Sequence, residues 1–195
     1  MNNANLPIAS RRGVILGTGR TLTAAGVAVL LGTGTAVIGA RSAKADAKQD
    51  VEILNAAIGL EHEGIAAYQI AAESGLLQPA VLEVGVTFQG HHKLHRDELI
   101  KAVTALGGAP AEAKKLDQYA ADLKASTLKD QEGVLRLALG LERGAANAYL
   151  SLIPSLGTDI HQVAARMAGD EAFHVAILAN ALGEPIPKEG LMFGA

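Results

Sequence analysis

The feature that most constrains this chain is an internal repeat in which charged residues interrupt apolar helical faces. Four segments carry such faces, and within each of them the residues follow at steps of three or four, which places their side chains on one side of an α-helix. The first pattern is Leu54, Ile58, Glu61, Ile65 and Tyr68, repeated 81 residues later as Leu135, Leu139, Glu142, Ala146 and Tyr149. The second is Phe88, His92, His95, Leu99 and Val103, repeated 79 residues later as Met167, Glu171, His174, Leu178 and Leu182.

This periodicity, with glycine and proline as breaks, predicts four long helices. We expect them over residues 50–74, 79–106, 131–153 and from just after Thr158 or Asp159 to 183, with Asp50 as the N-cap of the first. Residues 109–129 are polar and predict a long connection that contains a short helix. No stretch alternates with period two, so no sheet is expected. The predicted fold class is all-α: a four-helix bundle of two helical hairpins joined by a long crossover connection.

Residues 1–45 differ from the rest and are similar to an export signal. Arg11-Arg12 precedes an uncharged run over residues 21–40, and Ala43-Lys44-Ala45 offers a small-x-small cleavage site. The paired arginines and the weakly hydrophobic centre resemble a twin-arginine signal, with cleavage expected near Ala45. We therefore expect a periplasmic or otherwise exported protein that uses the twin-arginine export machinery, with residues 46–195 as the bundle. An N-terminal anchor that is never cut is the alternative, because the uncharged run is just long enough to span a bilayer.

Composition excludes several classes of site. The 195 residues contain no cysteine, which rules out disulfides, zinc–thiolate sites and thiol nucleophiles, and no tryptophan, which argues against a base-stacking platform. Residues 1–45 hold five of the 17 basic residues and none of the 20 acidic ones, so residues 46–195 carry 12 basic against 20 acidic groups, a net charge of −8. This acidic, soluble body argues against nucleic acid and anionic membranes as partners and tolerates cations.

The charged residues inside the repeat form the donor set of a di-metal site. Four-helix bundles build such centres from one glutamate on each of two helices and a Glu-x-x-His pair on each of the other two. Two divalent cations about 4 Å apart need several anionic oxygens to offset their repulsion, and mixed oxygen and imidazole ligands suit iron or manganese. Here the single glutamates are Glu61 and Glu142, and the pairs at i, i+3 are His92 with His95 and Glu171 with His174.

With these residues, the chain resembles the ferritin-like superfamily over about residues 50–183, and within it the exported bacterial ferritin-like domain proteins. The resemblance implies a bundle with two irons or two manganeses, and activities from ferrous oxidation and storage to peroxide or oxygen chemistry. It also implies the role of each matching residue. Glu61 and Glu142 would be terminal or bridging ligands, Glu171 a bridging ligand and His174 a terminal nitrogen ligand, with Tyr68 and Tyr149 as hydrogen-bonding residues behind them.

The second helix departs from the family pattern, because His92-Lys93-Leu94-His95 stands where Glu-x-x-His is usual. Moving the register back by three gives Gln89-Gly90-His91-His92, which also lacks the glutamate, so the choice between His91 and His92 as the inward residue stays open. A histidine in place of a bridging carboxylate removes one negative charge and one bridge. The predicted ligand set of three carboxylates and three imidazoles could hold two metals more loosely, one metal or none.

Simpler interpretations stand beside the metal site. Glu171 and His174 could bond each other and Tyr68 in a polar core without metal. His91, His92 and His95 could instead join Lys93 and Arg96 in a solvated basic face.

The sequence therefore predicts an exported bundle with iron or manganese as cofactor and oxygen or peroxide as the reactants of an oxidoreductase. The alternatives are metal binding or storage without turnover, and a stress-related structural bundle that has lost its metal. Gly140, Gly144 and Ala145 permit close helix contact within the bundle or between chains, so a homo-oligomer stays open.

Overall fold

The structure, a computed structural model, describes residues 43–194 and confirms an all-helical bundle. Within the described range it contains no strand. The export signal predicted for residues 1–45 lies outside the described residues except for Ala43–Ala45, so it stays a prediction. The long helices are α2 (Ala43–Glu73), α3 (Pro79–Ala105), α5 (Gln131–Leu152) and α6 (Thr158–Ala181); shorter elements are α4 (Leu116–Asp122), η1 (Ala125–Thr127) and η2 (Ile153–Ser155).

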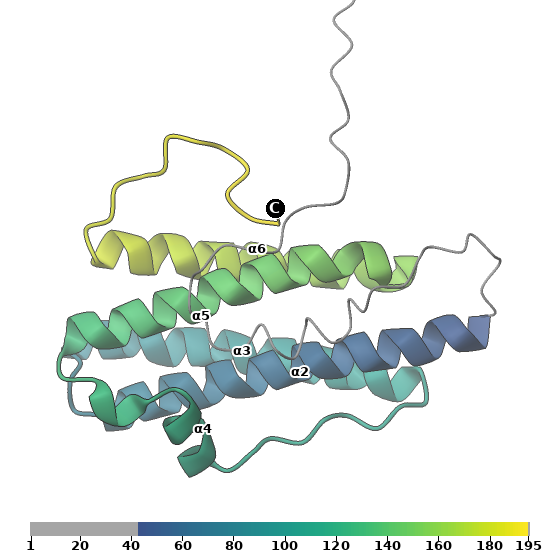
Figure 1. Ribbon diagram of the computed structural model, residues 1–195, viewed down its shortest axis with the longest axis horizontal. Coiled ribbons are helices and arrows are strands. Elements are labelled where there is room, and N and C mark those ends of the chain that lie inside the picture. The colour runs from purple at the N-terminus through teal and green to yellow at the C-terminus, as the bar shows by residue number, and fades with distance from the viewer. Residues whose placement is uncertain (1–42, 195) are drawn as a thin grey trace, which may run out of the picture.

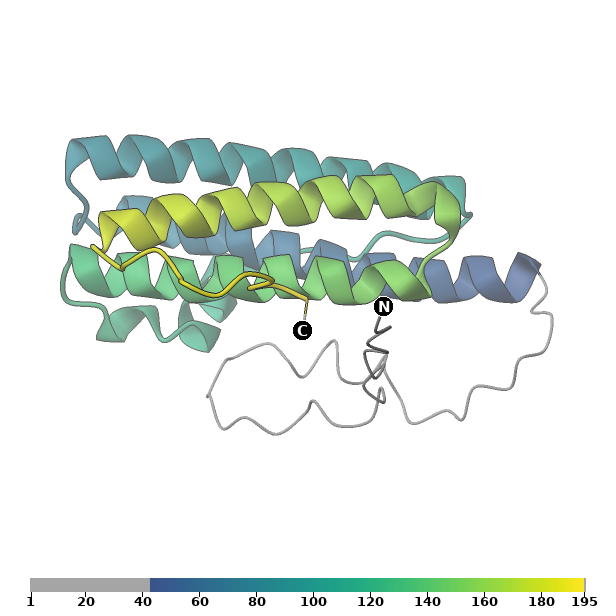
Figure 2. The same cartoon turned by 90° about the horizontal axis from the view of Figure 1, so that it is seen from above.

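The four long helices form two antiparallel hairpins, α2 with α3 and α5 with α6 (Figures 1 and 2). The connection from α3 to α5 runs back along the bundle and carries α4, which packs on α2 (Figure 1). Because of this long return, α5 begins at the same end of the bundle as α3. The predicted crossover between two hairpins is therefore present.

The predicted helix ends rest on local backbone chemistry. Pro79 opens α3, where its missing N–H costs nothing. Asp130 caps α5 by accepting a hydrogen bond of 2.8 Å from the backbone N–H of Gly133. Gly75, Gly107 and Gly183 follow α2, α3 and α6 with φ of +70°, +78° and +70°, a left-handed conformation that glycine adopts without a Cβ clash.

The role expected for Asp50 as an N-cap is wrong. Helix α2 begins at Ala43, so Asp50 lies inside the helix, where it is 6% exposed. Its carboxylate accepts hydrogen bonds of 3.1 and 3.3 Å from the backbone N–H of Gly157, the residue that precedes α6. Asp50 therefore satisfies a donor at the start of a helix in the other hairpin, a long-range contact that local sequence signals do not reveal.

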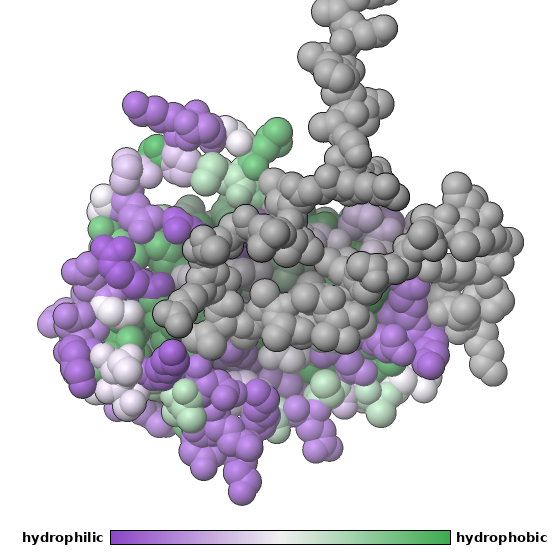
Figure 3. Space-filling view, viewed as in Figure 1, coloured by the Kyte–Doolittle hydropathy of each residue, from purple (hydrophilic) through white to green (hydrophobic). Residues whose placement is uncertain are grey.

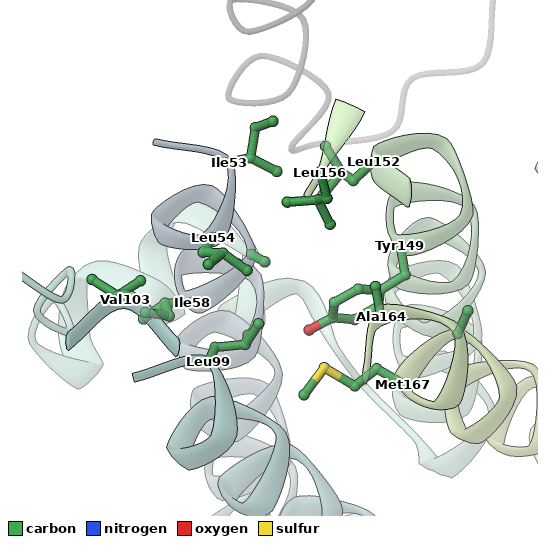
Figure 4. Packing of buried hydrophobic residues seen from close by; sticks show 12 residues of the cluster. Ile53, Leu54, Ile58, Leu99, Val103, Tyr149, Leu152, Leu156, Ala164 and Met167 are labelled. Carbon is green, nitrogen blue, oxygen red and sulfur yellow. The ribbon is translucent and has the colours of Figure 1, made fainter. Parts of the chain in front are cut away.

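Two apolar clusters fill the bundle on either side of its centre. One contains Ile58, Leu99, Tyr149 and Met167, and Figure 4 shows them converging from α2, α3, α5 and α6. The other contains Tyr68, Phe88, Leu135, Leu139, Val175 and Leu178. The charged positions of the repeat fall between the two clusters along each helix.

The outer faces of the helices are polar. In the view of Figure 3, hydrophilic side chains cover most of the described surface and apolar ones form smaller patches between them. Among the described helices, none combines the length and apolarity that crossing a membrane requires.

Candidate metal centre

The six residues predicted as ligands lie in one buried cluster between the two apolar clusters. None of them is more than 6% exposed, and Glu171 and His174 are fully buried. Two groups of four, sharing His92 and Glu171, each offer ligand atoms that lie within 4.8 Å of one another and could hold a metal ion. The groups are Glu61, His92, His95 and Glu171, and His92, Glu142, Glu171 and His174.

Hydrogen bonds between imidazoles and carboxylates join all four helices in this cluster. His92 lies between two hairpins, because its Nδ1 is 2.7 Å from Glu61 Oε2 and its Nε2 is 3.3 Å from Glu142 Oε1. The other contacts are His95 Nδ1 to Glu171 Oε1 at 3.0 Å and His174 Nδ1 to Glu142 Oε2 at 3.2 Å. Each histidine therefore has a carboxylate partner, as buried charges require.

Two tyrosine hydroxyls complete the cluster, one from each of the two apolar clusters. Tyr68 of α2 donates to Glu142 of α5, and Tyr149 of α5 donates to Glu61 of α2. Burial, together with the charge of the glutamate that each contacts, raises the pKa of both tyrosines well above 10.0. Both hydroxyls therefore stay protonated and act as donors.

The structure places His92 and His95, rather than His91, inside the bundle. His92 is 3% and His95 6% exposed, so a solvated basic face is the wrong interpretation for these two. His91 is half-buried instead, and its Nδ1 lies 2.9 Å from His174 Nε2. Phe88 stacks on the same His174 ring with centroids 4.0 Å apart, which fixes the plane of that imidazole.

Asp170 is a site residue that the sequence interpretation missed. Its Oδ2 lies 3.1 Å from His95 Nε2, on the side of the ring away from Glu171. The repeat contained a signal for this contact. Asp170 is 79 residues after His91, and His174 is 79 after His95, so the pairs His91–His174 and Asp170–His95 occupy equivalent places. A carboxylate on the outer nitrogen of a ligand histidine orients its ring.

Gly64 is the second missed residue, and its role is steric. A Cβ at this position would lie 2.9 Å from both Nδ1 and Cε1 of His92, closer than real side chains approach. The His92 ring cannot turn away freely because its two nitrogens contact Glu61 and Glu142. The equivalent position in the other hairpin is Ala145, and there the facing helix carries Glu171. The glycine therefore occurs in the hairpin whose facing helix carries His92 in place of that glutamate.

The carboxylates differ in how readily they take a proton. Burial alone raises the pKa of Glu61 and of Glu142, but hydrogen bonds outweigh burial and lower both pKa values. For Glu61 the main hydrogen bond comes from His92. For Glu142 the main ones come from Glu171 and His174. For Glu171, burial and the neighbouring Glu142 raise the pKa. Glu171 is therefore the carboxyl group that shares its site with another negative charge.

The buried histidines hold protons strongly in the metal-free cluster. Burial lowers the pKa of His92, His95 and His174, but hydrogen bonds to the glutamates outweigh it and raise all three, for His95 to about 10. Protons on these rings balance the buried carboxylates. A metal ion needs the same nitrogen atoms deprotonated, so metal binding must release protons.

One buried oxygen is left without a hydrogen bond. Among the described residues, Glu171 Oε2 has no hydrogen-bond partner, although His174 Nδ1 lies 3.4 Å away. An unpaired carboxylate oxygen in a dry interior is costly, and a metal ion would satisfy it. The donor set and this orphaned atom both fit a bound cation.

A surface cleft of about 450 Å³ lies outside the cluster between α3 and α6. Both His95 and Asp170 line it, together with His91, Glu98 and Arg166. Because His95 also contacts Glu171 at the centre, one imidazole separates the cleft from the buried carboxylates. The cleft is therefore one side chain away from the buried carboxylates.

Comparison with known proteins agrees with this geometry. The family described as Ferritin-like domain matches residues 49–184, which cover both hairpins except the first six residues of α2, and the connection between them. A search among curated proteins finds no match.

Replacing Gly64 by alanine should weaken metal binding without unfolding the protein. The new methyl group must displace the His92 ring, and perturbing the surroundings of a ligand lowers metal affinity about 10- to 100-fold. Gly59→Ala is the matched control, because the Cβ at exposed position 59 of the same helix meets nothing within 4 Å. Metal titration of both variants checks this, and equal affinities would show that Gly64 does not position His92.

The stability of the metal-free protein should fall as the pH rises above neutrality. The pKa of His95 is about 10 in the folded state against an ordinary 6.5, so the stability from its proton is fully present below pH 6.5 and is lost as the pH approaches 10. We expect a loss of roughly 2–4 kcal/mol over that interval. Urea unfolding in the presence of a chelator measures it. His95→Gln, which carries no titrating ring, should show a shallower decline, and the same slope in both proteins would contradict the assignment.

Proposed function

The chain belongs to the ferritin-like domain family, and we propose that its buried cluster is a two-metal centre that holds iron or manganese. The observation that carries the proposal is the pair of four-residue donor groups that share His92 and Glu171. Mixed imidazole and carboxylate donors suit these two metals better than calcium or magnesium, which prefer oxygen alone. The unpaired Glu171 Oε2 supplies a further free ligand atom.

We assign one metal position to each donor group. Glu171 belongs to both groups and has two oxygens, so it would serve both positions. His92 also belongs to both, but a neutral imidazole binds one ion at a time. Three carboxylates leave two divalent cations less well neutralised than the four of the usual family pattern. The second ion should therefore bind more weakly than the first.

Iron or manganese at this site would supply one-electron redox chemistry toward oxygen or peroxide, and we propose that the protein is an oxidoreductase of that kind. The protein residues prepare the site for it. Tyr68 and Tyr149 hold the oxygens of Glu142 and Glu61 in place across the two hairpins. The apolar clusters on both sides keep bulk water from the centre, and Asp170 orients His95 from the cleft.

A structural bundle without metal is the second candidate, and one observation favours it. Every imidazole of the cluster already contacts a carboxylate, and among its described oxygens Glu171 Oε2 alone lacks a hydrogen bond. Such a network can hold four helices together without an ion. Storage without turnover is distinguished from catalysis by whether oxygen or peroxide is consumed repeatedly or only once per bound metal.

Elemental analysis of the purified protein tests the proposal. We expect about two irons or manganeses per chain, the number that a ferritin-like centre holds. The double variant Glu142→Gln, Glu171→Gln should lose both, because it removes an anionic oxygen donor from each position. Glu63→Gln is the control, since Glu63 is buried on the same helix as Glu61 but interacts with Lys114 and Asp122 instead.

Each result of the elemental analysis has a definite meaning. One metal per chain would indicate that histidine at position 92 has removed the second position. No metal in the wild-type protein would reject the metal centre and leave the structural bundle. Two metals with repeated turnover of oxygen or peroxide would support the oxidoreductase, and two metals with a single round of oxidation would support storage.

We also propose that residues 1–45 direct export by the twin-arginine route and are removed after Ala45. Cleavage there would start α2 with Asp46, and a carboxylate at a helix N-terminus is favourable. The double variant Arg11→Lys, Arg12→Lys should remain inside the cell, whereas Arg20→Lys, Arg41→Lys, which also keeps the charge, should be exported. Cell fractionation and the mass of the N-terminal peptide measure both. Normal export of the first variant, or an uncut membrane-bound product, would contradict the proposal.

A further inference from the structure

A cavity of about 170 Å³ opens at the end of the bundle where α2 and α6 finish and α3 and α5 begin. This end carries η1 and lies at the left of Figure 1. The cavity reaches inward to His92 and Glu142, two members of the metal cluster. It is therefore a space that connects one end of the bundle with the candidate centre.

The walls of this cavity are almost entirely aliphatic or aromatic. All four long helices contribute, with Ala67, Val81, Phe88, Leu135, Ala138 and Leu178 among the lining residues. Polar atoms appear at the inner end, where His92 Nε2 lies 3.3 Å from Glu142 Oε1 and Tyr68 presents its ring. Water needs two to four polar partners to occupy a buried site, and these walls do not provide them.

The space exists because several wall positions carry small side chains. Ala67, Ala138 and Gly85 face it from three helices. A Cβ at Gly85 would touch Tyr68 at 3.6 Å, an ordinary contact, so sterics do not exclude a larger residue there. The opposite end of the bundle, related by the repeat, is filled by a packed cluster that includes Leu54, Ile58 and Leu99 (Figure 4). A protein interior is normally packed without such voids.

We propose that this cavity binds a small, largely apolar organic molecule, about the size of one aromatic ring, that carries a single hydrogen-bonding group. Apolar cavities of about 150 Å³ bind benzene, so the volume suits one ring. The apolar walls select the body of the molecule, and the His92–Glu142 end meets its polar group. The proposal that the cavity binds such a molecule rests on the cavity alone. The further step, that this molecule is the substrate of the metal centre, rests on the proposed function.

Phenol is the probe that tests the site, because it combines one ring with one hydroxyl group. Isothermal titration should detect phenol binding to the wild-type protein, both as isolated and after metal removal. Glycerol, of similar size but polar throughout, should not bind measurably. Ala138→Leu places a larger side chain in the cavity without replacing a candidate metal ligand, and we expect it to weaken phenol binding about tenfold or more. Ala176→Leu, the same change at an exposed position of α6, should leave binding unchanged.

The outcomes separate this site from the metal proposal. If the protein as isolated contains no metal but binds phenol, and Ala138→Leu abolishes that binding, the result would support the cavity and reject the metal centre. Full metal occupancy without phenol binding would support the metal centre and reject the cavity as a binding site. Equal phenol affinity in wild type and Ala138→Leu, or equal affinity for glycerol, would overturn the inference. Circular dichroism verifies folding, and Ala67→Leu replaces Ala138→Leu if the latter fails to fold.

Discussion

The burial of three carboxylates at the centre of an apolar bundle is the constraint on which this structure depends. An ionised carboxylate in a dry interior is tolerated only when it is paired and hydrogen-bonded. The chain meets this requirement through contacts between hairpins, since Tyr68 bonds Glu142 while Tyr149 bonds Glu61. The two hairpins therefore cannot separate without leaving buried charges unsatisfied. The same polar layer fixes their register, because sliding one hairpin would break both tyrosine bonds at once.

The repeat explains most of the cluster, and its one break explains the rest. The two tyrosine bonds are equivalent under the repeat, as are the contacts of His91 with His174 and of Asp170 with His95. The break is at position 92, where histidine stands in the place that Glu171 occupies in the other hairpin. A ring needs more room than a carboxylate, and the glycine at position 64 provides it. Histidine at position 92, in place of the glutamate of the repeat, is thus accompanied by glycine at position 64 of the facing helix, in place of the alanine of the repeat.

The sequence was sufficient for what depends on periodicity and insufficient for what depends on the approach of distant helices. The four long helices, the crossover and the convergence of the inward charges all follow from steps of three and four. The choice between His91 and His92 did not follow from these steps. Adjacent residues point in different directions around a helix, and only the packing of the helices decides which of the two faces inward. Asp50 looked like a local cap, yet it bonds Gly157 in the other hairpin. The cavity was equally hidden, since alanines such as Ala67 and Ala138 look the same in sequence whether they face a void or a neighbour.

The candidate centre lies between a surface cleft of mixed character and an apolar cavity. On one side, the cleft beside His95 and Asp170 combines charged and imidazole groups with the apolar side chains of Leu94, Val163 and Met167. On the other, the cavity beside His92 is apolar, and Gly64 belongs to its inner end. Glu142 already places one negative charge at that inner end, and a glutamate at position 92 would add a second, which an apolar molecule would also have to desolvate on binding. Histidine at position 92 instead holds a proton and pairs with Glu142, which offsets that charge and lowers the cost. We therefore infer that the break in the repeat and the cavity are linked: histidine at position 92 lowers the negative charge available to a second metal ion and also the cost of the apolar approach.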